Sequence, residues 1–215
     1  MIILYWMTPD PVVVTEQDTL LDAALLLRKH GIRRLPVVRD DDHLCGIIGR
    51  WDLYSWVDRD HLAGELAAEA RDTLSARTVA EAMTEDPKTC DAYDHLEEVS
   101  ERMRTEKVGA YPVLHRGHLV GIVSETDLLR AIAELAYHRS DGKRITVRIA
   151  QEEAAGLLYD VVDRSRRHGL ELLAILTHPI LDESALMATL RVRGRSVDKF
   201  LSALWDAGYK VVDVS

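Results

Sequence analysis

The sequence predicts an α+β protein: two similar β-α-β-β-α units followed by a third domain with a βαββαβ pattern. Two observations carry this prediction. A tandem repeat fills the first two thirds of the 215 residues, and the order of apolar segments changes after residue 144. With 47% hydrophobic and 29% charged residues, the chain has an ordinary globular composition. Its length suits one or two domains, each with its own core.

Three anchors that recur in the same order define the repeat. The first two return 76 residues later and the third 75 residues later. The pairs are 7–11 and 83–87 (Met-Thr-x-x-Pro), 35–38 and 111–114 (around Pro-Val), and 46–52 and 121–127 (Gly-Ile-x-x-x-x-Asp). Such constant spacing indicates a tandem duplication.

The first repeat is expected to hold one main helix among short strands. Asp18 or Thr19 caps this helix, and Gly31 ends it. The predicted elements are a strand at 12–14, a helix with Leu20, Ala23, Ala24 and Leu27 on one face, strands at 35–38 and 44–48, and a second helix from Trp51.

The second repeat follows the same order. Asp94, with Glu97 three residues on, predicts a capping box at its first helix. The predicted elements are a helix with Leu96, Val99 and Met103 on one face, strands at 111–114 and 119–123 around Gly117, and a helix near Thr126. A unit of about 55 residues is small, so the two copies are expected to pack on each other.

The third segment has a different pattern. Residues 139–144 are polar and contain a glycine, which predicts a linker. Strands at 145–149, 172–176, 186–192 and 209–214, with helices at 154–167 and 196–207, make a ferredoxin-like βαββαβ plait. Leu157, Leu158, Val161 and Val162 are expected to face inward. The predicted domains are therefore 1–76, 77–138 and 145–215.

Charge and composition exclude several classes of protein. A net charge of −9 argues against nucleic-acid partners and anionic membrane surfaces, which both need a basic field. No apolar run approaches the roughly 18 residues of a membrane span. The N-terminus lacks signal-peptide features. Cys45 and Cys90 have no metal-type spacing, which fits a reducing cytoplasm.

The order of the three anchors resembles the CBS domain, two of which form a Bateman module. The resemblance covers residues 1 to 138 and is carried by the duplicated pattern, including Gly-Ile-Val-Ser-Glu-Thr-Asp at 121–127. It implies a non-catalytic regulator that needs no cofactor and takes an adenosyl nucleotide as effector. AMP, ADP, ATP, S-adenosylmethionine and dinucleotides all share the ribose, so the choice among them stays open.

Residues 121–127 are the first site candidate, because they place a carboxylate and two hydroxyls where a strand meets a helix N-terminus. By the resemblance, Asp127 binds the ribose hydroxyls, and Ser124 and Thr126 contact phosphate or other polar groups. Tyr111 and Pro112 would line the adenine cleft. The alternative is that the three polar residues only cap the helix.

The first repeat departs from this pattern. It keeps Asp52 but has Gly49 and Trp51 where the second repeat has hydroxyls, so a bulky indole stands at the entry. Arg34, next to Arg33, is a candidate phosphate ligand here. The alternative is a degenerate, structural copy.

The corner at 153–158 resembles a worn D-x-P-G-h-h signature of ACT domains, with Glu153 for Asp and Ala155 for Pro. ACT relatives bind amino acids there, so Gly156 and Glu153 are possible effector contacts. The alternative is that Gly156 serves close packing. A CBS pair followed by an ACT-like domain is the AcuB-type arrangement, named for acetoin utilisation.

The other polar clusters predict no chemistry. His115 and His118 lie in a turn, and Asp40–His43 form a solvated turn, so no metal site is expected. No nucleophile, phosphate-loop or dinucleotide motif stands out, and we expect no enzyme.

The sequence thus predicts a cytoplasmic sensor with an unidentified regulated partner. An apolar face along Leu62, Leu66, Ala67, Ala70 and Leu74, after an aromatic helix, would suit a partner helix. By the resemblance, a homodimer is the expected assembly, because CBS modules and ACT domains commonly pair. The alternatives are an interaction module with vestigial sites and an enzyme or accessory protein of acetoin catabolism.

Overall fold

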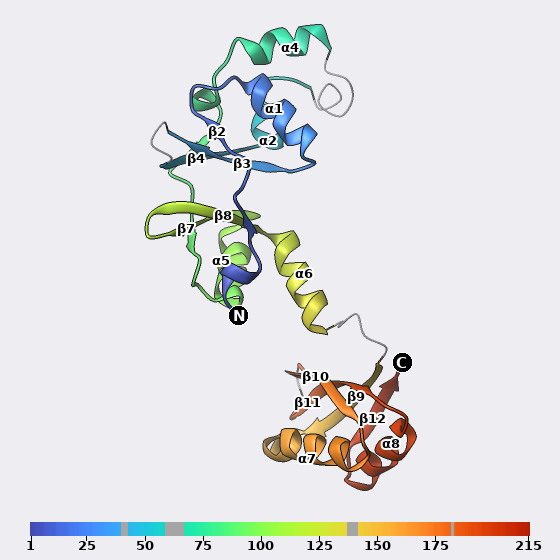
Figure 1. The fold of residues 1–215 in the computed structure, drawn as a ribbon. Helices are drawn as coiled ribbons and strands as arrows, with labels where there is room; N and C mark the ends of the chain where they lie inside the picture. Colours follow the sequence, from blue (N-terminus) through green and yellow to red (C-terminus); the bar gives the residue numbers. More distant parts are fainter. Residues whose placement is uncertain (40–42, 59–66, 137–141, 182) are drawn as a thin grey trace. The chain divides into compact units, whose positions relative to one another are not determined.

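The computed structural model describes residues 1–39, 43–58, 67–136, 142–181 and 183–215 (Figure 1). The chain divides into two compact units, Met1–Arg130 and Ala131–Ser215, and the division falls inside one helix. Two four-stranded sheets belong to the first unit and one to the second. The predicted domain boundaries stay predictions.

The first repeat follows the predicted order. Its elements are η1 (Ile3–Tyr5), β1 (Thr8–Pro9), β2 (Val14–Thr15), α1 (Leu20–Lys29), β3 (Arg34–Val38), β4 (Leu44–Gly49), α2 (Arg50–Leu53) and α4 (Ala68–Ser75). Thr19 is the N-cap of α1, because its hydroxyl accepts from the Asp22 amide and the Asp22 carboxylate accepts from the Thr19 amide. All four predicted helix residues of α1 are buried. Of the expected apolar face after α2, Leu62 and Leu66 lie outside the described residues, as do Asp40–Asp42.

In the second repeat one expectation is wrong. Its elements are η2 (Val79–Glu81), β5 (Thr84–Glu85), β6 (Cys90–Asp91), α5 (Leu96–Glu106), β7 (Ala110–His115), β8 (His118–Ser124) and α6 (Glu125–Ala136). The N-cap of α5 is His95, which makes no side-chain cap. Asp94 instead accepts from the Asp91 amide in the turn before the helix, as Asp18 does from Thr15 in the first repeat. Glu97 pairs with the N-terminal amine of Met1.

Each repeat completes the sheet of the other. The sheets run β2-β3-β4-β5 and β1-β8-β7-β6, so β1 joins the second repeat and β5 joins the first. Thr8 lies opposite Ile122, and Thr84 lies opposite Ile47. This exchange makes the two repeats a single folding unit.

Next to each exchanged strand, a methionine side chain packs directly against a glycine of the other repeat. A Cβ added at Gly121 would lie 2.5 Å from Met7 Sδ and 3.0 Å from the Thr8 carbonyl oxygen. Met83 covers Gly46 in the same way. The Met-Thr-x-x-Pro and Gly-Ile anchors therefore recur together because they contact each other across the repeats.

The third domain has the predicted βαββαβ element order. Its elements are β9 (Lys143–Ala150), η3 (Gln151–Glu153), α7 (Ala154–Arg167), β10 (Glu171–Pro179), β11 (Ala185–Arg193), α8 (Val197–Asp206) and β12 (Lys210–Val214). The sheet is antiparallel in the order β10-β11-β9-β12, and both helices contribute to its core through residues such as Val161 and Phe200. Gly169 and Gly208 follow the helices at positive φ.

Two details of this domain correct the sequence analysis. Lys143 and Arg144 belong to β9 rather than to a linker, because they pair with β11, and the predicted linker residues 139–141 lie outside the described part. Leu158 is 57% exposed and Val162 is 45% exposed. The buried residues of α7 are instead Leu157, Val161 and Ser165, which are spaced four residues apart on one face of the helix. Leu158 and Val162 lie at the side of this face, farther from the sheet.

Candidate functional site

The β8–α6 corner holds the Asp127 carboxylate firmly. Asp127 is 8% exposed. Its Oδ2 accepts hydrogen bonds from the Ser124 amide at 2.9 Å and the Ser124 hydroxyl at 2.7 Å. Its Oδ1 lies 3.3 Å from Nη2 of Arg130. These contacts cap the first turn of α6, so the capping role considered from the sequence exists in the structure.

Thr126 lies beside an arginine from the other repeat. Arg33 Nη2 donates to Thr126 Oγ1 at 2.7 Å. At the same corner, the Glu125 amide donates to the Gly109 carbonyl at 3.3 Å. The start of α6 is therefore held by both repeats.

The side chain of Arg34, like that of Arg33, extends toward the second repeat. Its Cγ lies 3.2 Å from the position of a Cβ added at Gly49, whereas its Nη1 lies 3.0 Å from a Cβ added at Gly109. Glu125 Oε2 lies 3.4 Å from the same position at Gly109. Arg34 was expected in the first repeat's site, but its long side chain carries the charge to the second repeat.

The first repeat has a simpler corner. Asp52 Oδ2 accepts from the Gly49 amide at 2.7 Å, and no hydroxyl stands beside it, since position 49 is glycine. Trp51 is 66% exposed and meets Tyr54 edge-on, with 5.3 Å between ring centroids. Most of the surface of the indole therefore faces solvent, and its expected place at the entry of a cleft stays a prediction.

Tyr111 lies in the core of the second repeat rather than along a cleft. It has 0% exposed surface, and its hydroxyl donates to Glu106 Oε2 at 2.6 Å. The Arg102 guanidinium lies 5.0 Å from the ring centroid. Burial, and then the hydrogen bond to Glu106, raise the pKa of Tyr111 to about 12. Ala110 to Val113 are all buried, so both faces of β7 are packed and Tyr111 belongs to the core. Its neighbour Pro112 lies opposite Ile122 of β8.

Gly156 and Glu153 are exposed at the start of α7. A Cβ added at Gly156 would meet nothing within 4 Å. The close-packing role considered for this glycine is therefore wrong, and the corner is open to solvent.

We expect Gly156→Ala to stabilise the protein by up to about 1 kcal/mol, because alanine is the better helix former and the site has space for a methyl group. Urea unfolding measures this difference. Gly169→Ala is the matched control: its surroundings are equally open, but its φ of 65° should make alanine destabilising. A loss of stability in Gly156→Ala would contradict the open site.

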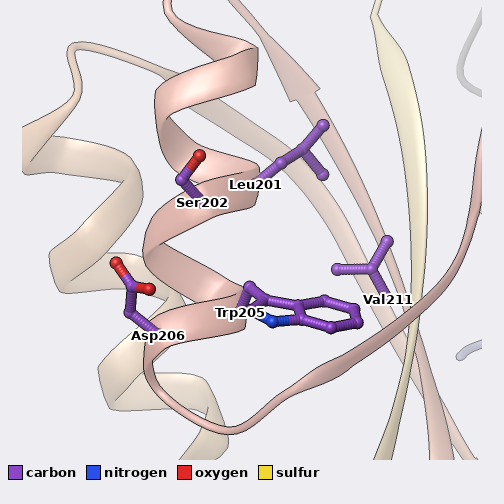
Figure 2. Close-up of a pocket in the computed structure, with 5 residues that line it drawn as sticks. All are labelled: Leu201, Ser202, Trp205, Asp206 and Val211. Carbon is purple, nitrogen blue, oxygen red and sulfur yellow. The ribbon is translucent and has the colours of Figure 1, made fainter.

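A shallow hollow of about 350 Å³ lies elsewhere on the same domain, between α8 and β12. Its lining residues are Leu201, Ser202, Trp205, Asp206 and Val211, and Figure 2 shows the Trp205 ring extending toward Val211. Trp205 is 64% exposed. The hollow shares no lining residue with the predicted effector corner at 153–156.

The remaining chemistry-bearing residues form no site among the described residues. No group of three or more metal-ligating side chains occurs there, although the rings of His43 and His118 lie 6.1 Å apart. Cys45 and Cys90 are buried, and burial raises the pKa of Cys90 to about 12, so its reactive thiolate is disfavoured. None of the described helices has the length and apolar character needed to cross a membrane.

The sequence analysis did not identify Gly109 as part of this corner, and it did not predict that Arg33 contacts the second repeat. Gly109 lies 76 residues after Arg33, so the two occupy equivalent positions in the repeats. The glycine leaves the space beside which the Arg34 guanidinium lies. Comparing the two repeats at this position could have suggested that an arginine of the first repeat contacts the second repeat, but not the reverse.

Comparison with protein families finds the CBS domain twice, at residues 3–59 and 79–134. A CBS domain-containing protein of Dictyostelium discoideum is 38% identical over 114 residues, which are 52% of this chain and 78% of the relative. Hypoxic response protein 1 of Mycobacterium tuberculosis is 35% identical over 123 residues, or 57% of this chain and 79% of the relative. Homoserine O-acetyltransferase of Methanosalsum zhilinae is 27% identical over 124 residues, only 22% of its length.

Solved structures agree over the same region. A putative acetoin utilization protein (AcuB) from Vibrio cholerae has a TM-score of 0.53 at 25% identity, covering 63% of this chain and 92% of that one. The CBS domain pair of protein MJ0100, solved with 5′-methylthioadenosine and S-adenosylmethionine, has a TM-score of 0.50 at 25% identity and covers 62% of this chain and 96% of that one. CBSX2 in complex with AMP shares the fold, with a TM-score of 0.53 at 23% identity over 62% of this chain and 97% of that one.

Proposed function

Because this chain belongs to the CBS-domain family, we propose that it is a non-catalytic regulator that binds an adenosyl ligand at the β8–α6 corner of its second repeat. The observation that carries the proposal is the buried Asp127, whose carboxylate accepts hydrogen bonds from the Ser124 amide and hydroxyl at the start of α6. Structural relatives with bound AMP, 5′-methylthioadenosine and S-adenosylmethionine support the adenosyl class.

The proposed role of Asp127 is to accept the ribose hydroxyls. Oδ2 is already fixed by the Ser124 amide and hydroxyl, so the carboxylate is oriented before a ligand arrives. A carboxylate has about four acceptor positions, and those left on Oδ1 can take ribose hydroxyls in exchange for Arg130. Capping and ligand binding are then two uses of one group. Thr126, which a guanidinium already contacts, is the proposed polar partner of the ligand's 5′ end.

The first repeat is proposed to be a structural copy. Asp52 keeps the backbone contact that Asp127 has, but the hydroxyls found in the second repeat are missing, because glycine and tryptophan stand at positions 49 and 51. Its helix α2 spans only Arg50–Leu53. One adenosyl site per chain follows.

The third domain is proposed to be ferredoxin-like and ACT-like, with Gly156 and Glu153 as possible effector contacts. Its element order and the strand order β10-β11-β9-β12 support the fold. A homodimer and an unidentified regulated protein complete the proposal, in the cytoplasm and, by analogy with AcuB, in acetoin utilisation. A ligand would shift the arrangement of the domains only by its differential affinity for the alternative states.

Thermal unfolding of the purified protein tests the ligand class. AMP, ADP, ATP, 5′-methylthioadenosine and S-adenosylmethionine are added in turn. A ligand at 100 times its Kd adds about 2.7 kcal/mol to the native state, which raises the midpoint by roughly 5–10 °C in a chain of this size. Guanosine nucleotides, at the same concentrations, are the control and should leave the midpoint unchanged. If none of the adenosyl compounds raises it, the proposal is wrong.

A second candidate is an interaction module without a ligand. Leu129 on α6 is 67% exposed and Trp51 on α2 is 66% exposed, and such large apolar side chains favour a protein contact. Light scattering would then find a stable dimer while all nucleotides leave the unfolding midpoint unchanged.

A further inference from the structure

We propose that Arg33 and Arg34, which belong to the first repeat, make the site of the second repeat selective for adenosyl ligands that carry phosphate. This inference rests on the function proposed above and names the ligand class within it. S-Adenosylmethionine and 5′-methylthioadenosine share the adenosine but have no phosphate.

The first step is the placement of the two guanidinium groups. Arg33 Nη2 donates to Thr126 Oγ1 at 2.7 Å, which puts its charge at the first turn of α6. Arg34 Nη1 lies 3.0 Å from a Cβ added at Gly109, on the loop whose carbonyl accepts from the Glu125 amide. Two cationic groups therefore lie beside the corner that holds Asp127.

The second step is the balance of charge at this corner. Within the part of the chain that the structure describes, no carboxylate lies within 4.0 Å of a nitrogen of either arginine. Asp127 is paired with Arg130 instead, and Glu125, whose carboxylate borders Gly109, is exposed. In a protein with a net charge of −9, two arginines that have no ion pair with a described residue at one corner are suited to an anion.

The third step is the asymmetry between the repeats. The positions equivalent to Arg33 and Arg34 are Gly109 and Ala110, neither of which carries charge. The first repeat's corner therefore receives no arginine from the second repeat at these positions. The phosphate selectivity is confined to the Asp127 site.

The chemistry follows from the guanidinium group. Its planar N–H donors match the oxygens of a phosphate, and such charge-assisted bonds are stronger than neutral ones. S-Adenosylmethionine carries a sulfonium and an ammonium against one carboxylate, so its net positive charge is unfavourable beside two arginines, whereas 5′-methylthioadenosine offers them no anionic group. A phosphate would also take Arg33 from Thr126, which links ligand binding to a contact between the repeats.

Isothermal titration of the full chain with AMP, 5′-methylthioadenosine and S-adenosylmethionine tests the inference. The variants are Arg33→Gln, Arg34→Gln and the double variant, and Lys29→Gln is the control because it removes one exposed positive charge from the same repeat. We expect the double variant to lose about 10- to 100-fold in AMP affinity. This loss corresponds to the free energy of one charge-assisted hydrogen bond, about 1.5–3 kcal/mol. Its affinity for 5′-methylthioadenosine should stay within about 2-fold of the starting protein, which also shows that the site is folded.

The possible results separate the two proposals. Unchanged AMP affinity in the double variant overturns the role of the arginines, as does tighter binding of S-adenosylmethionine than of AMP by the starting protein. In both cases the adenosyl site itself stands. If the starting protein binds none of the three compounds, the adenosyl site and the selectivity inferred for it both fail.

Discussion

Asp127→Ala is expected to weaken adenosyl-ligand binding by more than about 100-fold, because it removes the two charge-assisted hydrogen bonds proposed to the ribose, of roughly 1.5–3 kcal/mol each. Asp127 is buried and its carboxylate is held by the Ser124 amide and hydroxyl, whereas the nearby Glu125 is exposed. Isothermal titration with the compound that gives the largest thermal shift measures the loss.

Asp52→Ala is the matched control for this variant. Both carboxylates cap a helix start, Asp127 through the Ser124 amide at 2.9 Å and Asp52 through the Gly49 amide at 2.7 Å. Each substitution should therefore lower the free energy of unfolding by about 1 kcal/mol. Only Asp127→Ala should lose the ligand. Equal losses of affinity in the two variants would mean that capping alone explains the effect, or that both repeats bind.

Gly121→Val is expected to lower the free energy of unfolding of the first unit by about 3 kcal/mol, since overpacking in a filled region costs about this much. A Cβ at this position would lie 2.5 Å from Met7 Sδ and 3.0 Å from the Thr8 carbonyl oxygen. The methionine can turn aside, but the backbone oxygen belongs to β1, which pairs with β8. Urea unfolding, followed by circular dichroism, measures the change.

A double-mutant cycle with Met7 identifies the cause. Gly121→Ala and Met7→Ala are each expected to destabilise, the first by crowding and the second by leaving a cavity where the buried methionine was. Together they should cost at least about 1 kcal/mol less than the sum, because the shortened side chain makes room for the new methyl group. Additive costs would show that the contact across the repeats does not limit position 121.

Local patterns in the chain were enough to predict most elements. The spacing of Leu20, Ala23 and Leu27 predicted α1, and Thr19 is its cap. The βαββαβ order of the third domain follows from the same kind of signal, with Gly169 and Gly208 ending its helices. These features depend on residues within one or two turns of each other, where periodicity and turn chemistry carry the information.

The candidate site was predicted only in part. The repeat comparison singled out Asp127 and Ser124, which the structure brings together, and the chain belongs to the family that the motifs indicated. It misplaced Tyr111, which fills the core, and Arg34, whose charge lies beside the second repeat. The side of a strand that is packed and the reach of a long side chain depend on neighbours distant in the chain.

By itself, then, the sequence determined the duplication, the order of most helices and strands, the Thr19 cap of α1, and the family, because each of these is encoded in short segments or in their repetition. Only the tertiary structure decided that β1 and β5 exchange between the repeats, and that Arg33 meets Thr126. Pairing between strands far apart in the chain depends on which sheet edges and faces remain uncovered once the cores form. The local periodicity of the sequence does not contain this information.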